Sequence, residues 1–248
     1  MRALLLALCL AGASAAKLPS YLGPQCSQSA PPAELSACAE QRAKAGLPYL
    51  ANGDKKLRVP SMRPLVVPKM SLAQGTPQVG LNVTWEPAEI WGLDESRVFN
   101  MRMNYAKRTN EFDVIIPRFT LAGLYKSKGR VLLLPVSGNG KSNVTVTNLK
   151  VHYKYEFPSR KGADGKEYFD IVNTDIAITG ADHMVVDFEN IFNGDPVIGR
   201  QINVFLNENW RELIREMGPG MAEATGQVVL LVVKGLANHV PVNEMFAP

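Results

Sequence analysis

The stretch "FDVIIPRFTLAGLY", residues 112–125, changes the face that carries its apolar side chains. Apolar residues occupy even positions from Phe112 to Ile116, and odd positions from Phe119 to Leu121. Side chains alternate across a strand, so in a flat sheet this change of phase would turn Phe119 and Leu121 toward water. The stretch therefore predicts a strand that bends or coils so that both sets stay inside.

Pro117 lies where the phase changes. Because proline has no N–H to donate, it fits a bulge or a sheet edge better than a central ladder position. We predict a β-bulge at Pro117-Arg118, which would bend the strand. The stretch "NVTVTNLKVHYKY", residues 143–155, also changes phase, between Val146 and Leu149. Both changes favour a coiled antiparallel sheet, although an ordinary sandwich with a C-terminal helix has the same composition.

The pattern becomes helical after a strand-rich region that extends from about residue 77 to 188. Asp195 is a candidate N-cap and Pro196 suits the first helical position. Apolar residues then recur at helical spacing, at Ile198, Ile202, Phe205, Leu206, Leu213, Met217 and Met221. We expect Gly218-Pro219-Gly220 to kink or split the helix, which should end at Gly235. An unbroken helix would be roughly 58 Å long, so a sheet would have to wrap it.

Residues 1–16, "MRALLLALCLAGASAA", have the pattern of a signal peptide. Arg2 precedes an apolar run, and small residues end at Ala16. The alternative is a membrane anchor, but the run is far shorter than the ~20 residues that a span needs. We expect a soluble, secreted chain over residues 17–248.

Cys26 and Cys38 remain after the signal peptide, and in an oxidising compartment they should form one disulfide. Two free thiols or a shared metal ion are the alternatives. A helix is expected between Pro32, which suits its first position, and Gly46, which suits its end.

Two sequons, at Asn82 and Asn143, fit a secreted protein. Each asparagine shares the polar face of its expected strand with the threonine two residues later. A glycan could be accommodated on such a face, or the sequon could be unused.

Composition and motifs argue against several classes of function. The chain is 46% hydrophobic and 20% charged, and its net charge of +4 includes no basic tract for nucleic acid or an anionic membrane. The three histidines lack a second ligand at metal-site spacing, and the nucleophile motif GxSxG is absent. We predict no cofactor, no metal and no enzymatic activity, although a triad assembled from distant residues is the open alternative.

Two glycine-rich stretches are expected to form turns: "SGNGKS", residues 137–142, and "SRKGADGKE", residues 159–167. The first also suggests a phosphate-binding loop. That motif needs a glycine where Pro135 stands and a helix afterwards, so a hairpin turn is the better interpretation.

Several blocks, in order and spacing, resemble the insect takeout proteins and the haemolymph juvenile-hormone-binding proteins. The blocks are the two cysteines, "VPSMRPLVVPKM" (59–70), "FDVIIPRFTLAGLYKSKGRVLLLPVSGNG" (112–140), "FENIFNGDPVIGRQINVFLNENWRELI" (188–214) and "VPVNEMF" (240–246). The hormone carriers are expected to have a second disulfide, but this chain has no cysteine after Cys38. The resemblance is therefore to the takeout branch.

The resemblance implies an α+β fold in which a highly curved antiparallel sheet wraps a long C-terminal helix and encloses an elongated apolar tunnel. It also implies a secreted carrier of a small hydrophobic ligand, such as a terpenoid, a juvenile-hormone-like or a fatty-acid-like molecule. Apart from the resemblance, we expect a monomer that binds no nucleic acid and does not insert stably into a membrane. The alternative is a secreted interaction or signalling protein whose cavity is structural or vestigial.

Methionine and aromatic residues are the candidate tunnel wall, since methionine adapts to irregular apolar shapes. Alternation in "VFNMRMNY" places Phe99, Met101, Met103 and Tyr105 on one face. The full predicted wall is Trp85, Phe99, Met101, Met103, Tyr105, Ile116, Phe119, Leu133, Val151, Tyr153, Ile176, Phe205 and Leu213. Each of these side chains could equally belong to a simple packed core.

Overall fold

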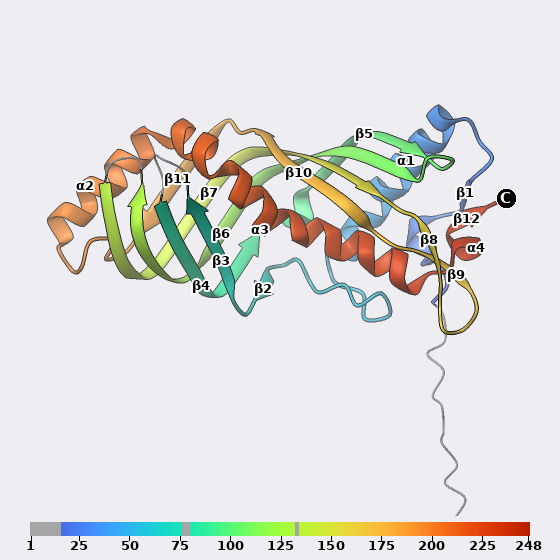
Figure 1. The fold of residues 1–248 in the computed structure, drawn as a ribbon, viewed down its shortest axis with the longest axis horizontal. Coiled ribbons are helices and arrows are strands. Elements are labelled where there is room, and N and C mark those ends of the chain that lie inside the picture. Colours follow the sequence, from blue (N-terminus) through green and yellow to red (C-terminus); the bar gives the residue numbers. More distant parts are fainter. Residues whose placement is uncertain (1–15, 76–79, 132–133) are drawn as a thin grey trace, which may run out of the picture.

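The computed structural model describes residues 16–75, 80–131 and 134–248. One curved antiparallel sheet extends along the molecule and does not close into a barrel, and a long helix lies along one face of it (Figure 1). The predicted α+β class, with a long C-terminal helix against a curved antiparallel sheet, is confirmed. The elements in chain order are η1 (Ser20–Leu22), β1 (Cys26–Ser27), α1 (Pro32–Leu50), β2 (Leu65–Val67), β3 (Met70–Gly75), β4 (Gly80–Trp91), η2 (Leu93–Glu95), β5 (Arg97–Asn104), β6 (Thr109–Val131), β7 (Leu134–Glu156), β8 (Ser159–Lys161), β9 (Glu167–Phe169), β10 (Val172–Gly180), β11 (His183–Phe188), α2 (Pro196–Glu208), α3 (Trp210–His239), α4 (Val242–Met245) and β12 (Phe246–Ala247).

The sheet is built around the antiparallel pair β6 and β7, each of 23 residues. The path β10-β7-β6-β4-β2 forms its frame, and β11, β3 and β5 pair with β7, β4 and β6 respectively. Because β6 and β7 are so long, each pairs with two shorter strands placed end to end along its other edge. The β6–β7 pair is therefore flanked by β5 and β10 at one end and by β4 and β11 at the other.

The phase change in β6 is real, but the predicted bulge at Pro117-Arg118 is wrong. Ile116 lies opposite Leu149 and Phe119 opposite Val146 in one unbroken register, and all four side chains are buried. Both strands therefore shift phase at facing positions, with no extra residue on either. On β7 the shift coincides with Asn148, whose φ of 48° is in the left-handed region that asparagine tolerates better than most residues.

Pro117 lies beside a gap in the pairing of β6. The β5 pairing reaches Ile115 and the β4 pairing begins at Thr120, so that no described strand pairs with residues 116–119 on that side. Gly92 packs into this gap, and a β-carbon there would lie 1.9 Å from the Arg118 carbonyl oxygen. Pro117 therefore lies at a local edge of the sheet, one of the two kinds of position that its missing N–H favours.

One of the two predicted turns is wrong. Residues 137–142 lie within β7 and form no turn. Gly138 is needed there because the backbone of residues 190–191 lies directly on the strand, and a β-carbon would come 2.0 Å from the Asn190 carbonyl oxygen. The other prediction is confirmed, since residues 162–166 connect β8 to β9.

The first helix begins at Pro32 as predicted but does not end at Gly46. It continues through Pro48 to Leu50. Gly46 instead allows close packing, because a β-carbon there would lie 2.2 Å from Leu22 Cδ2. The predicted disulfide is present: Cys26 and Cys38 are joined with an S–S distance of 1.95 Å, which links β1 to α1.

The C-terminal helical region begins as predicted but breaks elsewhere. Asp195 caps α2 by accepting hydrogen bonds from the N–H groups of Val197 and Ile198 at 2.9 and 3.0 Å. The break is at Asn209, whose amide donates to the Phe205 carbonyl at 2.8 Å. The helix is not split at Gly218-Pro219-Gly220, since α3 continues through Pro219, and its predicted end at Gly235 is wrong because it extends to His239. A kink at Pro219 stays a prediction.

The predicted buried stripe of these helices is largely confirmed. Ile202, Leu206, Leu213 and Met221 are buried, whereas Ile198 is 37% exposed. In the described part of the chain, α3 is the one helix long and apolar enough to cross a membrane by length and composition. In the structure this helix packs against β3, β9, β10 and β11.

Candidate ligand cavity

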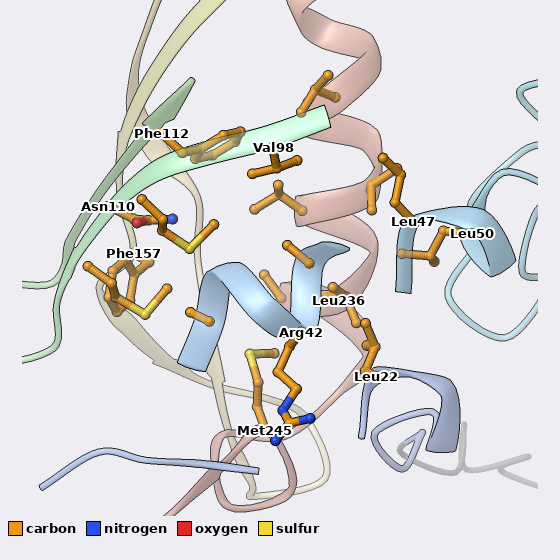
Figure 2. Close-up of a pocket in the computed structure, with 18 of the residues that line it drawn as sticks. Leu22, Arg42, Leu47, Leu50, Val98, Asn110, Phe112, Phe157, Leu236 and Met245 are labelled. Carbon is orange, nitrogen blue, oxygen red and sulfur yellow. The ribbon is translucent and has the colours of Figure 1, made fainter. Parts of the chain in front are cut away.

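The larger of two cavities with an almost wholly apolar wall lies between α1, the C-terminal half of α3 and one end of the sheet (Figure 2). This large cavity has a volume of about 250 Å³. Its wall is Leu18, Leu22, Pro24, Gln25, Cys26, Ala39, Arg42, Ala43, Leu47, Leu50, Met62, Leu93, Ser96, Val98, Met101, Met103, Asn110, Phe112, Val114, Tyr155, Phe157, Phe169, Ile171, Val228, Val229, Val232, Val233, Leu236, Ala237, Met245 and Phe246.

Helical periodicity places two of the cavity's walls. On α1, Ala39, Ala43 and Leu47 are four residues apart and therefore share a face. On α3 the same spacing applies to Val228, Val232 and Leu236, and Val229 and Val233 lie beside them. The alanines keep α1 thin on its inner face, which leaves space between the two helices.

The third wall comes from β5, and its facing differs from the predicted one. The register between β5 and β6 shifts between Phe99 and Arg102, where Asn100 has φ 53°. As a result Val98 shares the inner face with Met101 and Met103, and all three line the large cavity. Phe99 lines a separate outer depression instead, so its predicted place on the inner wall is wrong.

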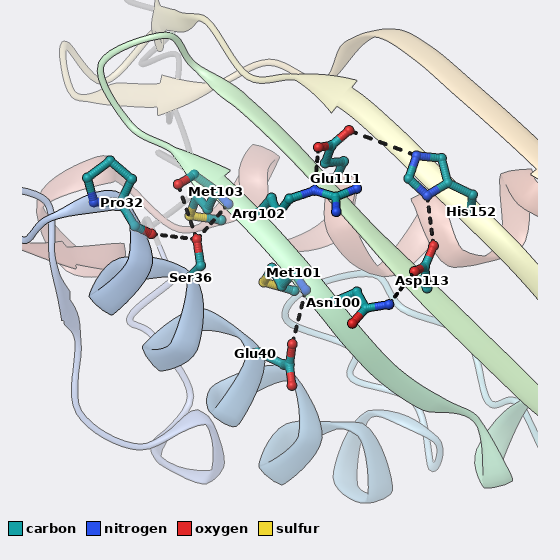
Figure 3. Close-up of polar contacts among 10 residues, drawn as sticks. All are labelled: Pro32, Ser36, Glu40, Asn100, Met101, Arg102, Met103, Glu111, Asp113 and His152. Carbon is teal, nitrogen blue, oxygen red and sulfur yellow. Dashed lines mark hydrogen bonds and ion pairs between the residues drawn. The ribbon is translucent and has the colours of Figure 1, made fainter.

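Side chains of α1 hold β5 in place (Figure 3). The Glu40 carboxylate accepts the Met101 N–H at 3.0 Å, and the Ser36 hydroxyl accepts the Met103 N–H at 2.9 Å. Residues 36 and 40 are one helical turn apart, which matches alternate N–H groups along the strand edge. A hydrogen bond from Lys44, and then the one from Met101, hold the pKa of Glu40 below its usual range.

Polar groups are few in the wall, and one of them is deeply buried. Asn110 is 1% exposed, and its Nδ2 donates to the Tyr155 hydroxyl at 2.9 Å. The side-chain carbonyl oxygen of Asn110, Oδ1, has no hydrogen-bond partner among the described residues. Burial raises the pKa of Tyr155 to about 12, so that the hydroxyl keeps its proton. Arg42 also faces the cavity, and its buried Nε likewise has no partner in the described chain.

Sequence reasoning missed Asn110 and Arg42, although a signal for Asn110 was present. Asn110 has the same parity along β6 as Phe112 and Val114, and Tyr155 has the same parity along β7 as Val151 and Tyr153. A lone asparagine in register with an inward apolar series indicates a buried amide that needs a partner.

A second, small cavity of about 70 Å³ lies under the other end of the sheet. Its wall is Met70, Leu72, Leu81, Val83, Trp85, Phe119, Leu121, Ser127, Val136, Val144, Met184, Val186, Phe188, Ile191, Leu206, Leu213, Met217 and Met221. The two walls have no residue in common. A single continuous tunnel thus stays a prediction.

The predicted wall residues are distributed over both cavities and the core. Met101 and Met103 line the large cavity, and Trp85, Phe119 and Leu213 line the small one. The others line neither cavity: Ile116, Val151 and Tyr153 are buried in the sheet, and Tyr105, Ile176 and Phe205 pack partly buried against the core. Leu133 lies outside the described residues. The binding role of every predicted residue stays a prediction.

One histidine–aspartate pair and both sequon asparagines lie on the outer surface. The His152 Nδ1 is 2.8 Å from Asp113 Oδ1 on the outer face of the sheet (Figure 3). No cluster of three potential metal ligands is found within residues 16–75, 80–131 and 134–248. Asn82 and Asn143 are exposed, as the sequons require, and whether they carry glycans stays a prediction.

Known proteins resemble this chain in sequence and in fold. The family model "Haemolymph juvenile hormone binding protein (JHBP)" matches residues 3–247. The chain is 23% identical over 221 residues to the circadian clock-controlled protein daywake of Drosophila melanogaster, which covers 85% of this chain and 83% of that protein. The daywake protein of Drosophila yakuba is 19% identical over 217 residues, with the same coverage of 85% and 83%.

Among solved structures, Takeout 1 of Epiphyas postvittana superposes with a TM-score of 0.77 at 23% identity, over 90% of this chain and 99% of that chain. At this identity the likeness is one of fold alone. The family model matches almost the whole sequence, and the chain therefore belongs to the haemolymph juvenile hormone binding protein family.

Proposed function

We propose that this protein is a secreted carrier that holds one small hydrophobic molecule in the large cavity. The observation that carries the proposal is a space of about 250 Å³ with a wall that is apolar except at a few positions. Apolar pockets with a small number of placed polar groups are typical of ligand sites. Membership of a family named for hormone binding supports the same conclusion.

The ligand class follows from the chemistry of the wall. Each ligand CH₂ that enters contributes about 0.8 kcal/mol, so a molecule of about a dozen carbons gains several kcal/mol without a charged clamp. The volume of about 250 Å³ lies just below the roughly 300–1,000 Å³ that is typical of ligand pockets, which favours one slender chain. A terpenoid, a juvenile-hormone-like or a fatty-acid-like molecule has these properties.

Secretion is part of the proposal and rests on three observations. Residues 1–16 have a signal-peptide pattern, the Cys26–Cys38 disulfide suits an oxidising compartment, and the family is named for a haemolymph protein. We infer that the mature chain extends over residues 17–248 and works as a monomer in an extracellular fluid.

An interaction or signalling protein is the second candidate, and α2 favours it. Val197 and Val204 are 52% and 55% exposed and lie two helical turns apart, at the end of the molecule opposite the large cavity (Figure 1). Exposed apolar side chains that line up on one helix face are a common feature of binding surfaces.

A displacement titration with a fluorescent apolar probe tests the carrier proposal. Ala43→Phe would fill the large cavity from α1, whereas Ala45→Phe adds the same side chain to an exposed position of the same helix. We expect lipids to displace the probe from the wild type and from Ala45→Phe, equally at low and high salt, and Ala43→Phe to bind much more weakly. No binding to any of the three proteins would favour the second candidate.

A further inference from the structure

We propose that Asn110 and Tyr155 form a polar subsite of the large cavity that selects ligands carrying a hydroxyl group, that is, long-chain or terpenoid alcohols. This inference rests on the proposed carrier function and names the ligand's polar group. It starts from the side-chain oxygen of Asn110, Oδ1. This oxygen has no hydrogen-bond partner among the described residues, and water scarcely reaches it because the residue is only 1% exposed. A buried acceptor without a partner is costly, so a donor on the ligand would be strongly favoured.

The neighbouring hydroxyl completes the subsite. Tyr155 accepts the Asn110 Nδ2–H at 2.9 Å, and so its own proton remains available to a further acceptor. The two residues therefore present one donor and one acceptor side by side in an apolar wall. Asn110 is labelled in Figure 2. An alcohol matches both groups, because its oxygen accepts a hydrogen bond from the Tyr155 hydroxyl while its own hydroxyl donates to Asn110 Oδ1.

Other head groups match the pair less well. An ester, an ether or an epoxide has acceptors only, so it can accept from Tyr155 but leaves the Asn110 oxygen without a donor. An ionised carboxylate also has acceptors only and would be repelled by that oxygen. A carboxylate would instead favour Arg42, which lines a different part of the wall, on α1 (Figure 2).

The test is a displacement titration with four compounds of one chain length: dodecanol, its methyl ether, dodecane and dodecanoate at neutral pH. We expect dodecanol to bind about tenfold tighter than the ether, which corresponds to one net hydrogen bond. Asn110→Leu should bring this ratio close to one without weakening dodecane. Tyr155→Phe should weaken the alcohol and the ether together, relative to dodecane.

Tyr168→Phe is the matched control, because it removes a tyrosine hydroxyl that bonds to Asp164 and does not line the large cavity. It should leave every ratio unchanged. If Asn110→Leu does not fold, Tyr155→Phe tests the subsite instead, through the ratio of the ether's affinity to that of dodecane. The subsite predicts that this ratio falls in Tyr155→Phe.

Equal binding of alcohol and ether by the wild type would overturn the subsite while leaving the carrier function intact. Tightest binding of dodecanoate, lost in Arg42→Gln, would also overturn it, because the head group would then lie at Arg42. Failure of all four compounds to bind would overturn the carrier function and the subsite together.

Discussion

Gly226 of α3 lies directly against Ile176 of β10, so closely that a β-carbon on the glycine would come within 2.5 Å of Ile176 Cδ1. The contact lies between the α3 residues that line the two cavities. Met221 precedes it and lines the small cavity, whereas Val228 follows it and lines the large one. The glycine thus lets the helix approach the sheet closely at this point.

Gly226→Ala should destabilise the fold by about 1–2 kcal/mol. Overpacking costs about 1–3 kcal/mol, and the gain in helix propensity returns at most about 1 kcal/mol. Gly218→Ala is the matched control on the same helix, because its β-carbon would meet no atom within 4 Å, and we expect it to be neutral or slightly stabilising. Urea denaturation measures both, and equal effects would show that the Ile176 contact does not limit the helix position.

Leu213→Asp should be severely destabilising, whereas Arg211→Gln should be mild. Leu213 is 3% exposed in the wall of the small cavity, so aspartate loses apolar burial and places an unpaired charge there, at a cost of about 3 kcal/mol or more. Arg211 is exposed, with its guanidinium 4.4 Å from the Trp210 ring centre, a contact worth about 0.5–1 kcal/mol. Thermal melts of the two variants that coincide would contradict the facing of α3.

Acid should loosen α1 from β5 through Glu40. Since the folded-state pKa of this glutamate is depressed, its contribution to stability is fully present above the unfolded-state pKa, about 4.3 for a glutamate. The contribution is lost as the pH falls through the lower, folded-state pKa. Glu40→Gln keeps an acceptor for the Met101 N–H but cannot titrate, so its stability should fall less steeply over this window. Parallel pH profiles of unfolding free energy for the two proteins would show that Glu40 plays no part.

The fold was predictable from the sequence wherever one local pattern decides the structure. The alternation of β6 predicted a strand that keeps both apolar sets inside, the Asp195-Pro196 pair predicted the start of α2, and the paired cysteines predicted the disulfide. In each case the physical cause lies within a few residues.

Features that depend on two segments could not be predicted in this way. The pattern of β6 shows that the phase shifts, but only its pairing with β7 shows that both strands shift together. The glycines at 46 and 138 suggested an end and a turn, yet each is required by another segment that packs against it. No local pattern indicates that α3 continues through Pro219. Likewise, no local pattern indicates that α2 ends before Asn209.

The site was predicted in kind and only partly in detail. Met101 and Met103 line the large cavity as expected, but the register shift at Asn100 replaces Phe99 with Val98. Choosing wall residues by their methionine or aromatic character also missed the alanine face of α1 and the valine face of α3. The small side chains of these two faces leave the space open.

The central claim is that the large cavity carries a hydrophobic molecule, and mass spectrometry of organic extracts from the protein purified from culture medium tests it most directly. We predict one or a few hydrophobic small molecules in near-equimolar amount in the wild type and in Ala45→Phe, and a strong depletion in Ala43→Phe. Extracts of all three that contain no molecule enriched over the medium, together with no lipid binding by the delipidated wild type, would contradict the account.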